Sequence, residues 1–252
     1  MKAILTTKNI RKFFGGLSAL NDVSLEVNKG LLTMIIGPNG SGKTTLINVI
    51  SGTLKPDYGK IYFERTDITG WEPHRINKIG IARTFQIARP FAKLTVLENL
   101  LIAAGEHIGE RVTVALSRGK WIKYEEELVE RAFTILSFLD LDHLWNRPAN
   151  ELSGGQLKLL EVGRILMNRP KLILMDEPIA GVNPKLAHEI FQYLTEIKKK
   201  FSTTLLIVEH RLDIALDYSD YVFAMHRGRV IAKGDPSEVT SHPKVIESYL
   251  GV

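Results

Sequence analysis

The sequence predicts an α/β protein built around a mostly parallel sheet, with an antiparallel β part at its start and a helical part in its middle. Three observations lead to this fold class. After residue 170, apolar strand-length segments alternate with helical ones, which is typical of parallel sheets covered on both faces. In the first thirty residues, short β-like segments alternate with turns, which suggests an antiparallel start. Between 96 and 168, apolar residues recur at helical spacing, as in the set Leu128, Ala132, Ile135, Leu136 and Leu139.

The expected elements can be placed along the chain by residue number. The expected strands are 4–10, 24–28, 31–37, 60–63, 171–176, 203–209 and 221–225. The expected helices are 43–51, several between 96 and 168, and segments near 184–200 and 211–218. Lys198, Lys199 and Lys200 are expected to end one helix, where cations suit the helix dipole. Residues 226–234 are expected to form a hairpin at the sheet edge.

The composition is that of a globular protein with a buried core, because 44% of the 252 residues are hydrophobic and 24% are charged. The longest apolar runs, such as 31–36, have strand length and fall short of the roughly 20 residues that cross a bilayer. The start of the chain lacks a secretory signal, so the cytoplasm is the expected location. The absence of cysteine excludes disulfides and thiolate metal sites. The net charge of +5 indicates a solvated basic surface or attraction to an anion.

A phosphate-binding loop is the first motif that carries chemistry. The segment GPNGSGKT, residues 37–44, follows an apolar strand and opens a helix. Its glycines allow successive backbone N–H groups to surround phosphate oxygens at the positive end of the helix dipole. The Lys43 amine can reach the β- and γ-phosphates, and the Thr44 hydroxyl can ligate Mg²⁺.

Two carboxylates supply the groups that such a loop needs nearby. Asp176 and Glu177 follow the apolar strand of the segment KLILMDE. Because ligands of parallel sheets bind at the carboxyl ends of the strands, Asp176 is placed to hold Mg²⁺. Glu177 is then placed to orient and polarise an attacking water.

A second glycine turn, LSGGQ at residues 152–156, raises the question of why one chain should carry two anion-binding devices. Ser153 can cap the helix that follows, and Gly154 and Gly155 leave backbone N–H groups free for an anion. Together with the first loop and the carboxylates, this segment separates the chain from other ATP- and GTP-using proteins.

With these motifs, nearly the whole chain resembles the ATP-binding cassette (ABC) family of ATPases. The resemblance implies a P-loop NTPase fold with an antiparallel β subdomain and a helical signature subdomain. It further implies that 1–252 form one nucleotide-binding domain, with a catalytic core in 1–90 and 166–252 and the helical subdomain at about 91–165. The cofactors that it implies are ATP and Mg²⁺.

The resemblance also implies roles for individual residues. The implied nucleotide-binding residues are Phe14, Asn39, Gly40, Ser41, Gly42, Lys43, Thr44 and Thr45, with Phe13 as the alternative aromatic that stacks on adenine. The implied catalytic residues are Glu177, His210 and Gln86, and the implied Mg²⁺ ligands are Thr44, Gln86 and Asp176. The signature residues are Ser153, Gly154, Gly155 and Gln156, and the D-loop ends at Asn183. Two departures from the family pattern are Asn183, where Asp is common, and Glu209, where a small or polar residue is usual.

The resemblance implies a head-to-tail dimer, in which the signature of one subunit covers the γ-phosphate on the phosphate loop of the other. The partner is a second copy or a sister ATPase. The segments RTFQIARPFAKLTVLENLLIA, DEPIAGVNP and VIAKGDPSEV…HPKVIESYLGV resemble the ATPases of branched-chain amino acid importers. Urea-type importers and lipopolysaccharide export are the alternatives.

In such a system the chain is expected on the cytoplasmic face of the membrane, as a peripheral subunit. It would bind ATP and ADP, contact integral membrane permease subunits, work indirectly with a periplasmic or extracellular solute-binding protein, and bind no nucleic acid. Phe85, Phe91 and Leu94 are candidate anchors for the permease. Two further readings are disfavoured. A chromosome-type ATPase would need a long coiled coil, and a monomeric kinase or GTPase would leave LSGGQ and His210 unexplained.

Overall fold

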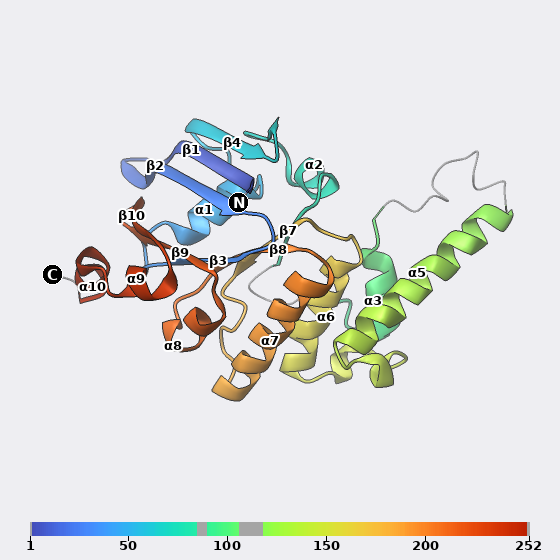
Figure 1. Cartoon of the computed structure of the whole chain (residues 1–252). Helices are drawn as coiled ribbons and strands as arrows, with labels where there is room; N and C mark the ends of the chain where they lie inside the picture. The colour runs from blue at the N-terminus through green and yellow to red at the C-terminus, as the bar shows by residue number, and fades with distance from the viewer. Residues whose placement is uncertain (1, 85–89, 106–117, 251–252) are drawn as a thin grey trace. The chain divides into compact units, whose positions relative to one another are not determined.

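The structure, a computed structural model, describes residues 2–84, 90–105 and 118–250. The chain divides into two compact units. The first combines Met1–Gln86 with Lys171–Val252, and the second is Ile87–Pro170. Figure 1 shows the chain from its first strands through the helices of the second unit and back to the last strands of the first.

A six-stranded sheet organises the first unit, in the order β10-β9-β3-β8-β7-β6. Its strands are β3 (Leu32–Ile36), β6 (Ile81–Arg83), β7 (Leu172–Asp176), β8 (Thr204–Val208), β9 (Tyr221–His226) and β10 (Arg229–Gly234). All neighbours are parallel except β9 and β10, which form the predicted antiparallel hairpin at the edge. Strands β3, β7 and β8 are buried at every residue, because both faces of a parallel sheet are covered.

A second, antiparallel sheet has the order β2-β1-β4-β5. Its strands are β1 (Ala3–Phe14), β2 (Leu17–Asn28), β4 (Tyr58–Phe63) and β5 (Thr66–Asp67). The strands predicted at 4–10 and 24–28 are thus parts of two longer strands. Register shifts in the β1–β2 pairing, including one between Thr7 and Ile10, indicate β-bulges in this pair of strands.

Two helices of the first unit lie close to their predicted ranges. Helix α1 (Lys43–Ile50) follows the glycine loop, and α7 (Pro184–Lys200) matches the predicted range. The buried residues of α7 recur every three or four positions: Ala187, Ile190, Phe191, Leu194 and Ile197. The predicted helix near 211–218 is divided into α8 (Leu212–Ala215) and the 3₁₀ turn η4 (Leu216–Tyr218). The remaining helices are α2 (Pro73–Lys78), α9 (Pro236–Thr240) and α10 (Pro243–Leu250).

The second unit is helical in its described part. It contains α3 (Val96–Ala103), α5 (Arg118–Phe138) and α6 (Gly154–Leu166), with 3₁₀ turns η2 (Asp142–Leu144) and η3 (Ala149–Glu151). The apolar face predicted from Leu128 to Leu139 is buried. Gly163 of α6 faces this core, because a Cβ there would lie 3.0 Å from a methyl group of Leu139 and 3.3 Å from one of Ile135.

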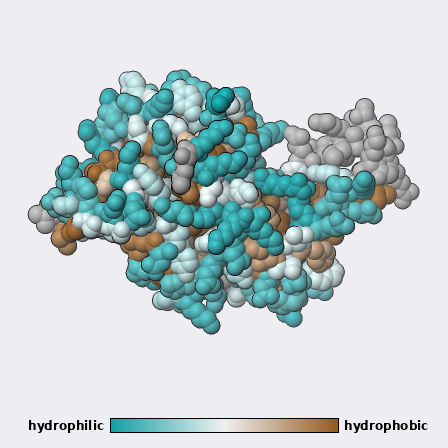
Figure 2. Space-filling view, in the orientation of Figure 1, coloured by the Kyte–Doolittle hydropathy of each residue, from teal (hydrophilic) through white to brown (hydrophobic). Residues whose placement is uncertain are grey.

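Most of the face of the molecule shown in Figure 2 is hydrophilic, with small hydrophobic patches. One patch lies at the end of α10, where Ile246 and Leu250 are exposed. Within the described residues, no helix has both the length and the apolar character that a bilayer-crossing segment requires.

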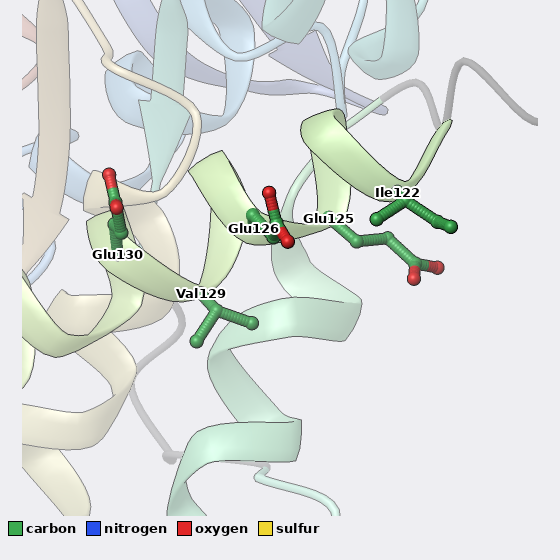
Figure 3. A pocket seen from close by; sticks show the side chains of 5 residues that line it. All are labelled: Ile122, Glu125, Glu126, Val129 and Glu130. Carbon is green, nitrogen blue, oxygen red and sulfur yellow. The ribbon is translucent and has the colours of Figure 1, made fainter. Parts of the chain in front are cut away.

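Helix α5 also borders an open hollow on the second unit. Figure 3 shows the side chains that line it: Ile122, Glu125, Glu126, Val129 and Glu130. Three carboxylates would repel a phosphate, so this hollow is not suited to a nucleotide.

We expect Gly163→Val to destabilise the second unit by about 1–3 kcal/mol, because a branched side chain would overpack the contact of α6 with α3 and α5. Urea unfolding of the purified chain measures this effect. Gly154→Ala, at the start of the same helix, is the control, since a Cβ there meets nothing within 4 Å. Equal stability of the two variants would contradict the close packing at Gly163.

Candidate active site

The backbone of the glycine loop between β3 and α1 lies close to the backbone of β2. Gly42, the residue before α1, has φ of 100°. A Cβ on Gly42 would lie 2.5 Å from the Ala19 carbonyl oxygen of β2, so both its conformation and its space require glycine. The first turn of α1 therefore begins against β2, and its free N–H groups face the loop.

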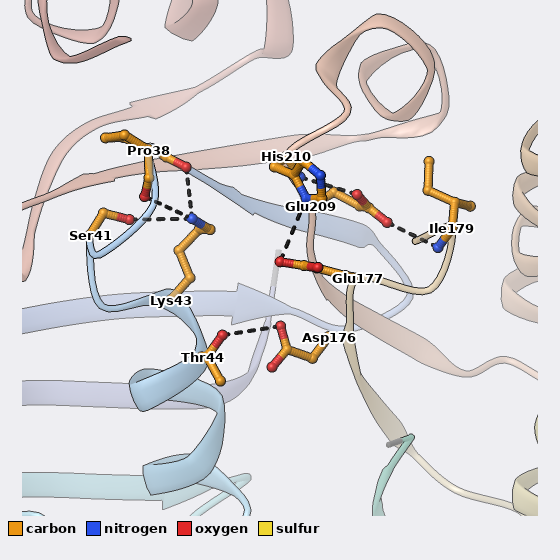
Figure 4. A network of polar contacts seen from close by, with 10 residues as sticks. Pro38, Ser41, Lys43, Thr44, Asp176, Glu177, Ile179, Glu209 and His210 are labelled. Carbon is orange, nitrogen blue, oxygen red and sulfur yellow. Dashed lines mark hydrogen bonds and ion pairs between the residues drawn. The ribbon is translucent and has the colours of Figure 1, made fainter. Parts of the chain in front are cut away.

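The Lys43 amine lies inside this loop. It donates hydrogen bonds to the Gly37 carbonyl at 2.7 Å and to the Pro38 carbonyl at 3.0 Å (Figure 4). Lys43 is only 6% exposed, and burial lowers the pKa of its amine, while the nearby carboxylates of Glu177 and Asp176 oppose that change. The loop carbonyls and the carboxylates thus hold a buried cation in place for an anionic ligand.

Asp176 ends β7 beside this cation. Its Oδ1 atom is 3.4 Å from the Thr44 hydroxyl, which donates to it (Figure 4). Burial raises the pKa of the Asp176 carboxyl, while the Thr44 hydrogen bond, Arg83 and Lys43 act to lower it. A hydroxyl and a carboxylate that approach each other from α1 and β7 are the hard oxygen donors that Mg²⁺ prefers, so the residues present fit this ion.

Arg83 is a neighbour of Asp176 that the sequence did not reveal as a site residue. Its Nη2 atom is 4.0 Å from Asp176 Oδ2, and its Nη1 donates to the hydroxyls of Ser51 at 3.0 Å and Thr53 at 3.3 Å. Arg83 ends the short strand β6, whose place beside β7 becomes visible only in the folded sheet. The residue contributes a partly buried positive charge to the site.

Glu177 leaves the sheet in an unusual backbone conformation. Its φ is 52°, in the left-handed region that non-glycine residues seldom occupy. Its N–H donates to the Val208 carbonyl at 2.9 Å, and its Oε1 lies 3.5 Å from the His210 Nδ1 atom. Such strain is characteristic of functional sites, and here it accompanies a carboxylate that faces an imidazole.

A cavity of about 390 Å³ in the first unit is lined by the glycine loop and Glu177. Its lining comprises Phe14, Leu17, Ser18, Ala19, Asn39, Gly40, Ser41, Gly42, Lys43, Thr44, Thr45, Glu177 and Arg227. The eight residues expected to contact nucleotide are all present. Of the two candidate aromatics, Phe14 lines the cavity, with 48% of its surface exposed.

The cavity also contains residues that sequence reasoning missed. Leu17, Ser18 and Ala19 lie on β2, across the hairpin from Phe14, and the turn at Gly15 and Gly16 is the signal that could have placed them. Arg227 lies in the turn between β9 and β10, and no sequence signal marks its approach to the loop.

The second glycine turn begins α6. The Ser153 hydroxyl accepts from the Gln156 N–H at 3.3 Å, and Gln156 Oε1 accepts from the Ser153 N–H at 2.9 Å, which forms a capping box. Ser153 and Gly154 are exposed, and Gly155 is buried. The start of α6 is therefore accessible to an external anion.

Of two other predicted site residues, Asn183 is described by the structure and Gln86 is not. Asn183 caps α7, because its side-chain oxygen accepts from the Leu186 N–H at 2.9 Å. Gln86 lies outside the described residues.

A buried lysine in a glycine loop, beside a carboxylate pair at the end of a parallel strand, defines a phosphate-loop nucleotide-binding protein. The chain belongs to the ABC transporter family, which matches residues 20–180. A second family, described as branched-chain amino acid ATP-binding cassette transporter, matches residues 229–252. The resemblance and the fold class predicted from the sequence are thereby confirmed.

Similar proteins span the full length of the chain. A probable branched-chain amino acid transport ATP-binding protein LivG from Archaeoglobus fulgidus is 56% identical, over 98% of this chain and 95% of its own. The ADP conformation of an ATP-binding cassette of an ABC transporter aligns with a TM-score of 0.87 at 54% identity, over 100% of both chains. A dimeric bacterial ABC transporter cassette aligns with a TM-score of 0.74 at 27% identity, over 92% of this chain and 98% of its own.

We expect Lys43→Met to weaken ATP binding roughly tenfold to hundredfold, because charged hydrogen bonds to phosphate contribute about 1.5–3 kcal/mol. Isothermal titration with ATP measures the change. Lys60→Met is the matched control, since Lys60 pairs with Asp67 on the antiparallel sheet, outside the cavity. Unchanged affinity in Lys43→Met would show that the loop does not bind the phosphates.

Proposed function

We propose that this chain is the ATP-hydrolysing subunit of an ABC importer, which closes as a dimer on two ATP molecules and drives transport through separate membrane subunits. The observation that carries the proposal is the cavity lined by Lys43, Thr44 and Glu177, with Asp176 bonded to Thr44, in a chain that also has an exposed capped turn at Ser153. A monomeric nucleotide-binding protein would need the first feature and not the second.

The chain's own groups divide the work of hydrolysis. Lys43 and the loop amides bind the β- and γ-phosphates, and Phe14 stacks on the adenine. Thr44, Asp176 and Gln86 would hold Mg²⁺, which when bound neutralises charge on the phosphate oxygens. Glu177 accepts a proton from the water that attacks the γ-phosphorus. The bond from this phosphorus to the bridging oxygen breaks, and ADP leaves with the bonding electrons. His210, beside Glu177, contacts the γ-phosphate.

The dimer completes each site with a second helix end. The start of α6 offers Ser153, Gly154 and Gly155 to the γ-phosphate on the partner subunit, and an anion at a helix N-terminus gains about 0.3–2 kcal/mol. This contact exists only while the γ-phosphate remains, so hydrolysis weakens the dimer. The dimeric ABC transporter cassette with a similar fold supports the formation of a dimer. The D-loop residue Asn183 faces the partner, which is a second copy or a sister ATPase.

Branched-chain or other hydrophobic amino acids are the proposed solutes. The support is the name of the similar LivG protein and the match of residues 229–252 to the branched-chain amino acid family. The subunit would lie on the cytoplasmic face of the membrane, with a solute-binding protein acting from the other side. Urea-type import and lipopolysaccharide export are the alternatives to be tested.

A surface for the permease is proposed around Phe91. Phe91 is 49% exposed, and the Arg164 guanidinium lies 5.4 Å from its ring centroid. The buried amide of Asn99 holds the loop before α3, because it donates to the carbonyls of Phe91 and Leu94 and accepts from the Phe91 N–H. The loop thus presents an exposed aromatic on a fixed backbone. The third predicted anchor, Phe85, lies outside the described residues.

We expect Glu177→Gln to reduce ATP hydrolysis by roughly 10²–10⁴-fold, since the general base is lost, while ATP binding is retained. ATP should then trap a dimer on gel filtration. In the double variant with Ser153→Arg, ATP should bind to each monomer without dimer formation, because the added side chain blocks the start of α6. A double variant that still dimerises with ATP would contradict the role of the second glycine turn.

We expect leucine, isoleucine or valine to stimulate the ATPase when the chain is reconstituted in liposomes with its co-purifying permease subunits and solute-binding protein. Stimulation arises because solute on the binding protein favours the closed dimer. The measurement is phosphate release with each solute in turn, with urea as the comparison. Stimulation by urea alone would select the alternative importer.

A further inference from the structure

Glu209 is a buried carboxylate to which the catalytic scheme assigns no role. It follows β8 directly and is 0% exposed. Its Oε1 accepts from the Ile179 N–H at 3.1 Å, and its Oε2 accepts from the His210 N–H at 3.1 Å (Figure 4). The Arg211 backbone also acts to lower the pKa of this carboxyl.

Burial of a charged carboxylate costs free energy unless hydrogen bonds compensate for the lost water. Burial raises the pKa of the Glu209 carboxyl, and the backbone amides and the His210 side chain oppose that rise. A buried carboxylate that loses its hydrogen bonds is strongly destabilising, so the amides and the side chain depend on each other. The small or polar side chain that is usual at this position lacks two separate carboxylate oxygens. It therefore cannot accept hydrogen bonds from donors on two segments at once.

The two donors belong to different parts of the site. Ile179 is two residues beyond Glu177, whose own N–H is bonded to the Val208 carbonyl. His210 and Arg211 belong to the segment after β8. Glu209 therefore links the backbone that carries Glu177 to the backbone that carries His210, whose side chains are 3.5 Å apart.

A second link joins the same two segments. The Arg211 Nη1 atom donates to the Val182 carbonyl at 3.3 Å, one residue before Asn183. The residues on both sides of His210 thus hold the segment from Glu177 to Val182 at two points. Movement at the D-loop end of this segment would be transmitted to His210 through these contacts.

We propose that Glu209 is a positioning residue for ATP hydrolysis, which fastens the Glu177 segment to the His210 segment so that the two side chains keep their relative placement. The proposal rests on the ATPase function proposed above. Glu209 is fully buried and both its oxygens accept backbone N–H groups, so it acts through the backbone and not on the nucleotide.

The test compares Glu209→Gln with wild type in steady-state hydrolysis. An amide has a single acceptor oxygen, and its NH₂ group would oppose a backbone N–H. We expect kcat to fall roughly tenfold to hundredfold through misplacement of Glu177 and His210. The KM for ATP and the affinity for ADP should stay within about twofold, because the phosphate loop is untouched.

Hydrogen exchange supplies a readout that general loss of stability would not give. In Glu209→Gln, the amides of Ile179 and His210 should exchange faster, while those of β3 and β7 stay protected. Ile207→Val is the matched control, since Ile207 is equally buried on β8 and its side chain does not bond these amides. We expect that variant to keep wild-type kcat and wild-type exchange at the two amides.

Two results would overturn the proposal: a kcat of Glu209→Gln within about twofold of wild type, or exchange accelerated throughout the first unit together with loss of ADP binding. If Glu209→Gln does not fold, Arg211→Met tests the second link. An unchanged kcat in Arg211→Met would then overturn the proposal. Absence of ATP hydrolysis in the wild-type chain would refute the proposed function. Hydrolysis that is lost in Glu177→Gln but normal in Glu209→Gln would refute the positioning role alone.

Discussion

The parallel register of β3, β8 and β7 is the constraint on which the rest of the site depends. In that register Ile35 pairs with Val208, and Val208 pairs with Asp176. The three strands therefore leave the sheet along one edge, which collects the glycine loop, Glu209 and Glu177. A slip of one residue would turn each side chain of a strand to the opposite face. The apolar packing that fixes the register thus also fixes the charged groups.

Three charged side chains at this edge of the sheet are buried from water. Lys43, Asp176 and Glu209 are all at least nine-tenths buried, and each has specific partners: loop carbonyls for the amine, the Thr44 hydroxyl for Asp176, and backbone amides for Glu209. Isolated buried charges cost several kcal/mol each. Folding therefore supplies the energy that sets these groups in place, and a phosphate that enters the cavity meets dipoles that need little rearrangement.

Local signals allowed much of this architecture to be predicted, and tertiary contacts account for what could not be. Helix α7 was predictable because Asn183, Pro184 and the final lysines mark its ends within the sequence. The glycine loop and the carboxylates were predictable from their spacing after apolar strands. The approach of Arg227 to the loop was not, because it depends on where a hairpin packs. Glu209 stood out by residue type, but its partner Ile179 lies 30 residues away and offers only a backbone N–H, which no side-chain pattern records.

The segment from Glu177 to Asn183 connects these observations. Its start is bonded to Val208, its middle to Glu209 and Arg211, and its end caps α7 through Asn183. Asn keeps the cap that Asp would provide, since its side-chain oxygen accepts the same Leu186 N–H, but it carries no charge. The departures at Asn183 and Glu209 therefore act on the same segment. Asn183 holds the far end of the segment to α7 without a charge. Glu209 holds the middle of the segment to the His210 segment through a buried carboxylate. The segment is therefore constrained along its whole length.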